Sequence, residues 1–247
     1  MRPVHYKIGL TPDQIGPILK QATLDNSHVY LVTDTHVNSI YGERITSWIK
    51  SGWLRSSTVI LAGEPSKSTR MVTDLQTEWF KGGVDRNSCI LAFGGGVVGD
   101  LAGYASSTIL RGIDYIQIPT TLLAMVDSST GGKTAVDTCY GKNTIGTFHS
   151  PKGVYICPSF LDTLSDTEFS MGMAEIIKIA LTSNCELWDI LSEAGSHPIR
   201  NNPEMMYRVI RMAIETKRKI VNCDPTETLS QREVLNFGHT IGLLYIR

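Results

Sequence analysis

The sequence lacks most features that mark secreted, metal-clustered or membrane-spanning chains. Its five cysteines are odd in number and form no C-x-x-C pair, which argues against a disulfide framework and a cysteine-zinc site. The first residues contain no apolar signal core, and no apolar run approaches the length of a membrane span. We therefore expect free thiols, a cytoplasmic location and no membrane partner.

The chain also lacks an excess of charge. Its 23 Lys and Arg residues nearly balance its 24 Asp and Glu residues, and no basic run is present. This balance argues against nucleic acid or an anionic membrane surface as a partner. Any small anion must be recognised by a few placed Lys and Arg side chains. The 247 residues allow one large domain or two modest ones.

Short apolar runs alternate with helical patterns in the first part of the chain. Residues 28–33, 58–62, 89–93 and 115–118 are predicted strands, and the apolar spacing over 70–80 predicts a helix. Strands that alternate with helices are typical of an α/β fold with a mostly parallel sheet. No internal repeat interrupts the pattern.

The pattern becomes helical after about Pro158. Ser165 and Glu168 have capping-box spacing before a helix that should run to about residue 181. Pro203 suits a first helical position, and this second helix should run to about residue 221. A third apolar stretch begins near Val234. We predict an α/β domain over residues 1–158 and a partial α-helical domain over residues 159–247.

The segment from Gly94 to Asp100 contains G-x-G-x-x-G after a predicted strand. Such glycines let a phosphate approach the backbone at a helix N-terminus, although a tight strand-to-helix turn explains them equally well. In a standard dinucleotide fingerprint, a ribose-binding acid follows the glycines by about twenty residues. Here the better candidate, Asp34, precedes them, so the pattern is not that of a standard Rossmann dehydrogenase.

Two Gly-Lys pairs lie close together, at Lys133 and Lys142. Gly131-Gly132-Lys133-Thr134 looks like the end of a Walker A loop, but the position of its first glycine is Asp127, which argues against a P-loop. The two pairs suggest loops that present ammonium groups to an anion. Solvated loop lysines are the alternative.

Glu175 and Lys178 are neighbours on a predicted helix that is apolar nearly all round. A surface ion pair is the usual explanation, but a buried carboxylate needs a charged partner or a metal. His239 stands alone in an apolar stretch, and no H-E-x-x-H is present. Spacing alone does not connect Glu175 with His239.

The chain contains five segments, in the order GGGVVGDLAGYASSTILRG, IPTTLLAMVDSSTGGKTAVDT, GKNTIGTF, GMAEIIK and LNFGHTIG. Together they resemble the 3-dehydroquinate synthase family, most closely the synthase domain of arom-type polypeptides. The resemblance runs from about Val29 to Gly242. It implies an NAD- and metal-dependent cyclase of aromatic biosynthesis, with zinc or cobalt. Its substrate would be 3-deoxy-D-arabino-heptulosonate 7-phosphate, and it would form a homodimer.

The resemblance also implies roles for single residues. The metal ligands would be Glu175 and His239. The substrate would be bound by Arg111, Lys133, Asn143, Lys178, Lys217, Arg232 and Asn236. The cofactor would be bound by Asp34, Glu64, Lys67, Gly95, Gly96, Asp100, Thr120, Thr121, Asp127, Lys142 and Thr163.

The resemblance implies a third metal ligand, a histidine in a His-Gly-Glu motif, which this sequence does not reach. A catalytic zinc site normally has three protein ligands. We therefore expect little turnover from this chain alone, as from a fragment of an ordinary synthase. The alternatives are an NAD-binding protein without turnover, a related sugar-phosphate cyclase, or a polyol dehydrogenase.

Overall fold

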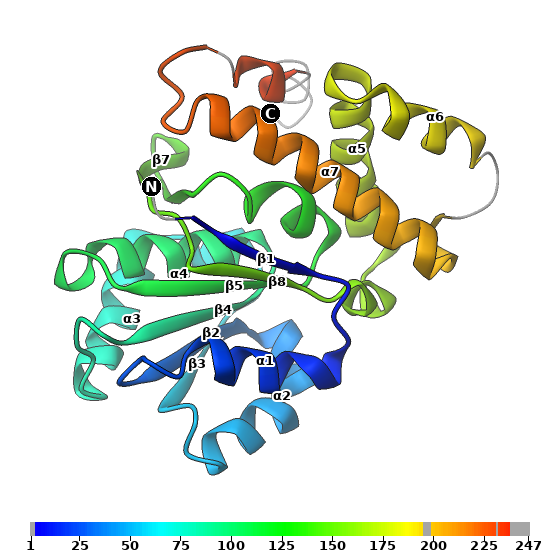
Figure 1. Cartoon of the computed structure of the whole chain (residues 1–247). Helices are drawn as coiled ribbons and strands as arrows, with labels where there is room; N and C mark the ends of the chain where they lie inside the picture. Colours follow the sequence, from blue (N-terminus) through cyan, green and yellow to red (C-terminus); the bar gives the residue numbers. More distant parts are fainter. Residues whose placement is uncertain (1–2, 195–198, 231, 238–247) are drawn as a thin grey trace.

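The computed structural model describes residues 3–194, 199–230 and 232–237 (Figure 1). Its centre is a six-stranded sheet in the order β1-β8-β5-β4-β2-β3, with every neighbouring pair parallel. The strands are β1 His5–Ile8, β2 Val29–Asp34, β3 Ser56–Ile60, β4 Cys89–Gly94, β5 Asp114–Pro119 and β8 Gly153–Ile156. The four predicted strands and the parallel α/β class are confirmed. Sequence inspection missed β1 and β8, which have only four residues each.

Alternate residues along the strands supply two hydrophobic cores, one on each face of the sheet. Leu31 and Leu91 belong to the core that contains α1 Pro12–Ala22 and α2 Thr35–Lys50. Val32 and Ile90 belong to the core that contains α3 Thr69–Lys81 and α4 Gly96–Thr108. This division follows from the two-residue period of a strand. Because both faces are covered, the central strands are continuous apolar runs.

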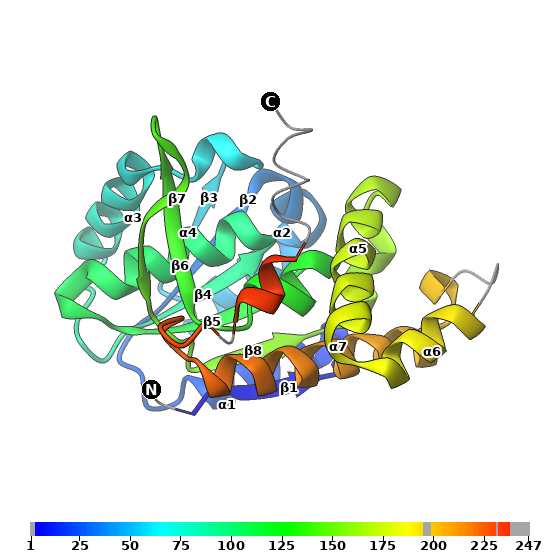
Figure 2. The ribbon, with the colours of Figure 1, turned by 90° about the horizontal axis from the view of Figure 1, so that it is seen from above.

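Three helices follow the sheet: α5 Asp166–Ser183, α6 Cys185–Glu193 and α7 Pro203–Cys223 (Figure 2). Ser165 caps α5 by accepting a hydrogen bond from the Glu168 N–H, as its spacing predicted. The predicted helices α5 and α7 are confirmed, whereas α6 was missed. Buried residues of all three helices join the core of α1 and α2. The proposed division at residue 158 therefore stays a prediction.

A two-stranded hairpin lies against α4, with β6 Lys133–Thr138 antiparallel to β7 Gly141–Phe148 (Figure 2). Lys133 and Lys142 belong to these strands, so the prediction that loops present them was wrong, whereas Gly131 and Gly132 precede β6. The β7 strand is exposed along most of its length, so no apolar alternation marked it in the sequence. A π-helical turn, η3 Ala124–Ser128, precedes the hairpin, and a 3-10 helix, η6 Glu233–Asn236, follows α7. Within the described ranges, no helix is long and apolar enough to cross a membrane.

Candidate active site

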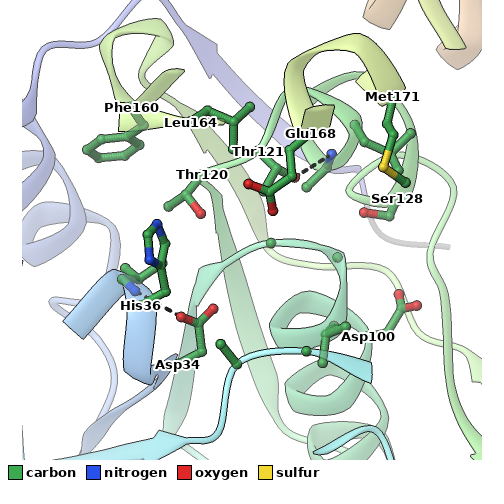
Figure 3. Close-up of a pocket in the computed structure, with 18 of the residues that line it drawn as sticks. Asp34, His36, Asp100, Thr120, Thr121, Ser128, Phe160, Leu164, Glu168 and Met171 are labelled. Carbon is green, nitrogen blue, oxygen red and sulfur yellow. Dashed lines mark hydrogen bonds between the residues drawn. The ribbon is translucent and has the colours of Figure 1, made fainter. Parts of the chain in front are cut away.

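A pocket of about 750 Å³ lies where β2, β4 and β5 end, beneath the start of α5 (Figure 3). In open α/β sheets, ligands bind in a crevice at the carboxyl ends of the strands. Every residue predicted to bind the cofactor lines this pocket except Lys142. Lys142 lies beside it, because its ammonium is 3.5 Å from the carboxylate of Glu64, which does line it. We call this the strand-end pocket.

Gly95 and Gly96, which we call the glycine turn, form the floor of the strand-end pocket. Gly95 is the N-cap of the 13-residue helix α4, so amide groups and the helix dipole at this end favour a negative group. A Cβ on Gly95 would lie 3.2 Å from Thr121 Cγ2, and one on Gly96 would lie 3.2 Å from Ser128 Oγ. Glycine therefore leaves the backbone accessible in a crowded place, which suits a diphosphate.

Asp34 caps a helix and also lines the pocket. Its Oδ1 accepts a hydrogen bond of 2.8 Å from the Val37 N–H and so caps α2. Figure 3 shows the carboxylate beside His36 at the wall of the pocket. The side chain is thus fixed by its own helix in a position where a ribose hydroxyl could donate to it.

Lys67 and Asp100 form a nearly buried ion pair in the same pocket, 2.6 Å apart. Burial raises the pKa of Asp100 to about 6, and the Lys67 charge opposes this shift without cancelling it. Lys67 also donates to Asn143 Oδ1 over 2.5 Å. The ammonium therefore connects the strand-end pocket with the β6–β7 hairpin.

A second pocket, of about 580 Å³, adjoins the first, and we call it the cationic pocket. The two share Asp100, Asp127, Ser128 and Asn143 as lining residues. The predicted substrate residues that line the cationic pocket are Lys133, Asn143, Lys217, Arg232 and Asn236. Arg232 is only 3% exposed, and its Nε has no hydrogen-bond partner among the described residues. A buried cation of this kind suits an anionic ligand.

Two lysine–carboxylate pairs lie at or next to the shared wall: Asp127 lines both pockets, and Glu175, which lines neither, contacts Asp127. Lys217 donates to the Asp127 side chain and, over 2.8 Å, to its carbonyl oxygen. Lys178 lies 2.6 Å from Glu175 and also donates to the carbonyl oxygen of Leu235. The neighbouring Glu175 and Lys178 expected from the sequence are confirmed, and both are almost buried. This setting departs from an ordinary surface pair.

The pKa values of the two acids in these pairs, Asp127 and Glu175, shift in opposite directions. Burial would raise the pKa of Asp127, but the charge and hydrogen bond of Lys217 outweigh it and lower that pKa. Burial first, and the negative charge of Asp127 second, raise the pKa of Glu175. Two neighbouring carboxyl groups do not ionise equally easily, because the negative charge of the first disfavours ionisation of the second.

Glu175 fits the role of one metal ligand. Its Oε1 is buried and accepts no hydrogen bond of good geometry, although the Lys178 ammonium is close. Carboxylate oxygen is a common zinc ligand. No group of three His, Cys, Asp or Glu side chains gathers in the parts of the chain that the structure describes. The other predicted ligand, His239, lies outside those parts.

Sequence inspection missed Glu227, which lines the cationic pocket. Its carboxylate pairs with Lys133, and the hydrogen bond from Lys133 lowers its pKa. The residue has a φ of +57° in the turn after α7. A single Glu in a polar segment carries no signal in the sequence, so only the fold could show its place.

Two predicted substrate residues, Lys178 and Arg111, line neither pocket, and only Lys178 lies near them, paired with Glu175. Arg111 lies elsewhere. It lines a third hollow, of about 530 Å³, together with Arg86, His149 and Lys152. It lines neither the strand-end pocket nor the cationic pocket. Its predicted contact with substrate therefore stays a prediction.

A parallel sheet with a glycine turn at the carboxyl ends of its strands is the arrangement of nucleotide-binding α/β folds, and the adjoining pocket adds the buried cations Lys217 and Arg232. The family model for the N-terminal part of 3-dehydroquinate synthase matches residues 57–171, and the model for its C-terminal part matches residues 172–244. The chain belongs to the 3-dehydroquinate synthase family.

Individual relatives agree with this assignment. A 3-dehydroquinate synthase of Caldanaerobacter subterraneus is 42% identical over 93% of this chain and 64% of its own length. One of Prochlorococcus marinus is 40% identical over 97% of this chain and 66% of its own length. The chain thus spans just under two thirds of the length of these relatives.

Solved structures share the fold. A 2-epi-5-epi-valiolone synthase of Streptomyces hygroscopicus with NAD+ and Zn2+ bound is 32% identical, with a TM-score of 0.86 over 97% of this chain and 67% of its own. A 2-deoxy-scyllo-inosose synthase complexed with carbaglucose-6-phosphate, NAD+ and Co2+ is 25% identical, with a TM-score of 0.80 over 97% of this chain and 65% of its own.

Proposed function

We propose that the chain carries the 3-dehydroquinate synthase activity, or the larger part of its active site. The reaction converts 3-deoxy-D-arabino-heptulosonate 7-phosphate into 3-dehydroquinate and phosphate. The observation that carries this proposal is that the strand-end pocket and the cationic pocket share a wall. A hydride acceptor in one pocket would then lie beside an anionic sugar in the other.

NAD in the strand-end pocket and a divalent metal at Glu175 are part of the proposal. Support comes from the two cyclases above, whose structures hold NAD+ with Zn2+ or Co2+. When bound, NAD supplies hydride chemistry and the metal polarises an oxygen of the substrate. Asp34 would accept from a ribose hydroxyl, and the Gly95–Gly96 backbone would face the diphosphate. His239 is the second ligand that the family resemblance implies.

The chain's own cations would hold and orient the substrate. Arg232 and Lys217 are almost fully buried, so an anion that reaches them meets little competition from water. Lys133 lies at the pocket wall and is half-exposed. Asp127, whose pKa is lowered by Lys217 against the effect of burial, would stay ionised beside the substrate.

The remaining parts of the proposal concern organisation. Residues 1–158 would form the NAD-binding domain, and residues 159–247 would belong to the metal- and substrate-binding domain. We propose a cytoplasmic homodimer, by analogy with the family. Sedimentation of the purified chain at several concentrations tests the oligomeric state.

Calorimetry with NAD and an assay of phosphate release, both on the purified chain with zinc and the heptulosonate phosphate, test the main proposal. NAD binding together with phosphate release supports the synthase. Binding of both NAD and phosphate supports a synthase site even with little release, which is the outcome that the sequence leads us to expect. NAD binding without phosphate binding favours the alternative of an NAD-binding protein without turnover. A folded chain that binds neither NAD nor phosphate contradicts the proposal.

A related sugar-phosphate cyclase is the second candidate, favoured by the TM-score of 0.86 with the valiolone synthase. The two hypotheses differ in the substrate that is consumed. Incubation with the heptulosonate phosphate, followed by mass analysis of the products, distinguishes them, because only the synthase should form 3-dehydroquinate.

A further inference from the structure

Asn143 stands at the wall between the two pockets in an uncommon conformation. It lines both pockets, and its φ is +56°. Residues other than glycine rarely adopt this left-handed region, although asparagine tolerates it better than most. Such a backbone persists only where the surroundings hold it in place. The contacts of Asn143 should therefore identify what holds it.

Two hydrogen bonds fix Asn143. Its backbone N–H donates to Asp137 Oδ1 over 2.7 Å, and its side-chain Oδ1 accepts from Lys67 Nζ over 2.5 Å. A carboxamide has one oxygen acceptor and one NH2 group with two donors. Because the oxygen is engaged by Lys67, the NH2 group is the part that a ligand would meet. Asn143 is thus set to donate to an oxygen of that ligand.

Asp137 lines neither pocket, yet it contacts both residues of this arrangement. It lies at the register shift of the β6–β7 hairpin, between Val136 and Thr138. Its backbone N–H donates to the Lys67 carbonyl oxygen over 2.9 Å, while its carboxylate holds the Asn143 N–H. Irregularities of this kind near active sites re-aim side chains.

We propose that Asp137 is a positioning residue for the reaction. It ties the hairpin to Lys67 and holds Asn143 so that the carboxamide NH2 faces the wall shared by the pockets. There the NH2 group donates to an acceptor oxygen of the anionic substrate. This role rests on the proposed function, and no residue role in the family resemblance includes Asp137.

The test compares Asp137→Ala and Asp137→Asn with the matched control Thr144→Val. Thr144 bonds Thr138 across the same turn over 2.7 Å and lines neither pocket. In Asp137→Ala, calorimetric affinity for inorganic phosphate should fall about tenfold, because Asn143 loses the charge-assisted hydrogen bond that holds its backbone N–H. Asp137→Asn should recover most of the loss, since its amide oxygen still accepts from Asn143. NAD affinity should change less than twofold.

Two further measurements separate positioning from mere support of the hairpin. Amide hydrogen exchange at Asn143 should speed up at least about tenfold in Asp137→Ala and not in Thr144→Val. In an Asn143→Ala background, Asp137→Ala should cost almost nothing further. An equal cost in both backgrounds, or an unchanged exchange rate, overturns the role of Asp137. Failure of the wild-type chain to bind either NAD or phosphate contradicts the proposed function instead, and the exchange result still decides whether Asp137 holds Asn143.

Discussion

The strand-end pocket and the cationic pocket are built in different ways. The first rests on backbone: the carboxyl ends of three strands, a glycine turn and the N-terminus of α4. The second rests on side-chain charges, with Lys217 held by Asp127 and Lys133 held by Glu227. Backbone geometry is fixed by the sheet itself, whereas buried charges depend on their partners. Ligand binding in the first pocket should therefore be most sensitive to steric change at the glycine turn, and ligand binding in the second to loss of a single charge.

The largest effect should come from Gly95→Val, which places a side chain against Thr121 and over the amides of the glycine turn. We expect NAD affinity to fall on the order of a hundredfold, about 3 kcal/mol. Phosphate affinity in the cationic pocket should stay within about twofold, because that pocket does not include Gly95. Calorimetry with each ligand measures both. An equal loss for phosphate would contradict the separation of the two pockets.

Lys217→Met should damage the cationic pocket and the stability of the fold together. Lys217 is 6% exposed, and its removal leaves the Asp127 carboxylate without its main partner. We expect a loss of about 2 kcal/mol in unfolding free energy, less than for a wholly buried pair because Asp127 is partly exposed. Urea denaturation measures it.

Lys219→Met is the matched control, since Lys219 is exposed on the same helix. The double variant Lys217→Met, Asp127→Asn should recover part of the loss, because no unpaired carboxylate remains. No recovery would indicate that Lys217 stabilises the fold by packing alone.

Asp100 should make the strand-end pocket sensitive to pH. Its pKa in the folded chain is raised from 3.8 to about 6, so the fold binds this proton more tightly than the unfolded chain does. The resulting stabilisation is present below about pH 4 and is lost as pH rises to about 6. Relative to Asp100→Asn, the wild-type chain should lose on the order of 1 to 2 kcal/mol across this range. Urea denaturation at pH 4.5 and pH 7 tests it, and the opposite sign would contradict the raised pKa.

The smallest effect should come from Asn202→Ala, outside both pockets. The Asn202 side chain caps α7 by accepting a 3.0 Å hydrogen bond from the Met205 N–H. Its loss should reduce the unfolding free energy by about 1 kcal/mol. Affinities for NAD and phosphate should not change. A weaker phosphate affinity would indicate that the cationic pocket depends on the start of α7.

Sequence patterns predicted the elements with strong local signals. Cys89–Gly94 is a continuous apolar run ended by glycines, and Ser165 with Glu168 is a capping box, so both elements form where expected. Helix α6 carried a local signal that sequence inspection missed, since Asn184 caps it and the buried Leu187 and Ile190 have helical spacing. The β7 strand gave no such signal, because it is exposed along most of its length and forms by pairing with β6. An exposed strand has no apolar alternation that a short window could detect.

The family, the parallel sheet and the residues around the glycine turn could all be predicted from the amino-acid sequence, because they depend on local backbone preferences and on contiguous motifs. Which charges meet became visible only in the folded chain. Folding paired Glu227 with Lys133, joined Lys67 to Asn143, and placed Arg111 in a separate hollow. Electrostatic contacts depend on distance in space, and residues 76 positions apart, such as Lys67 and Asn143, meet only after the chain has folded.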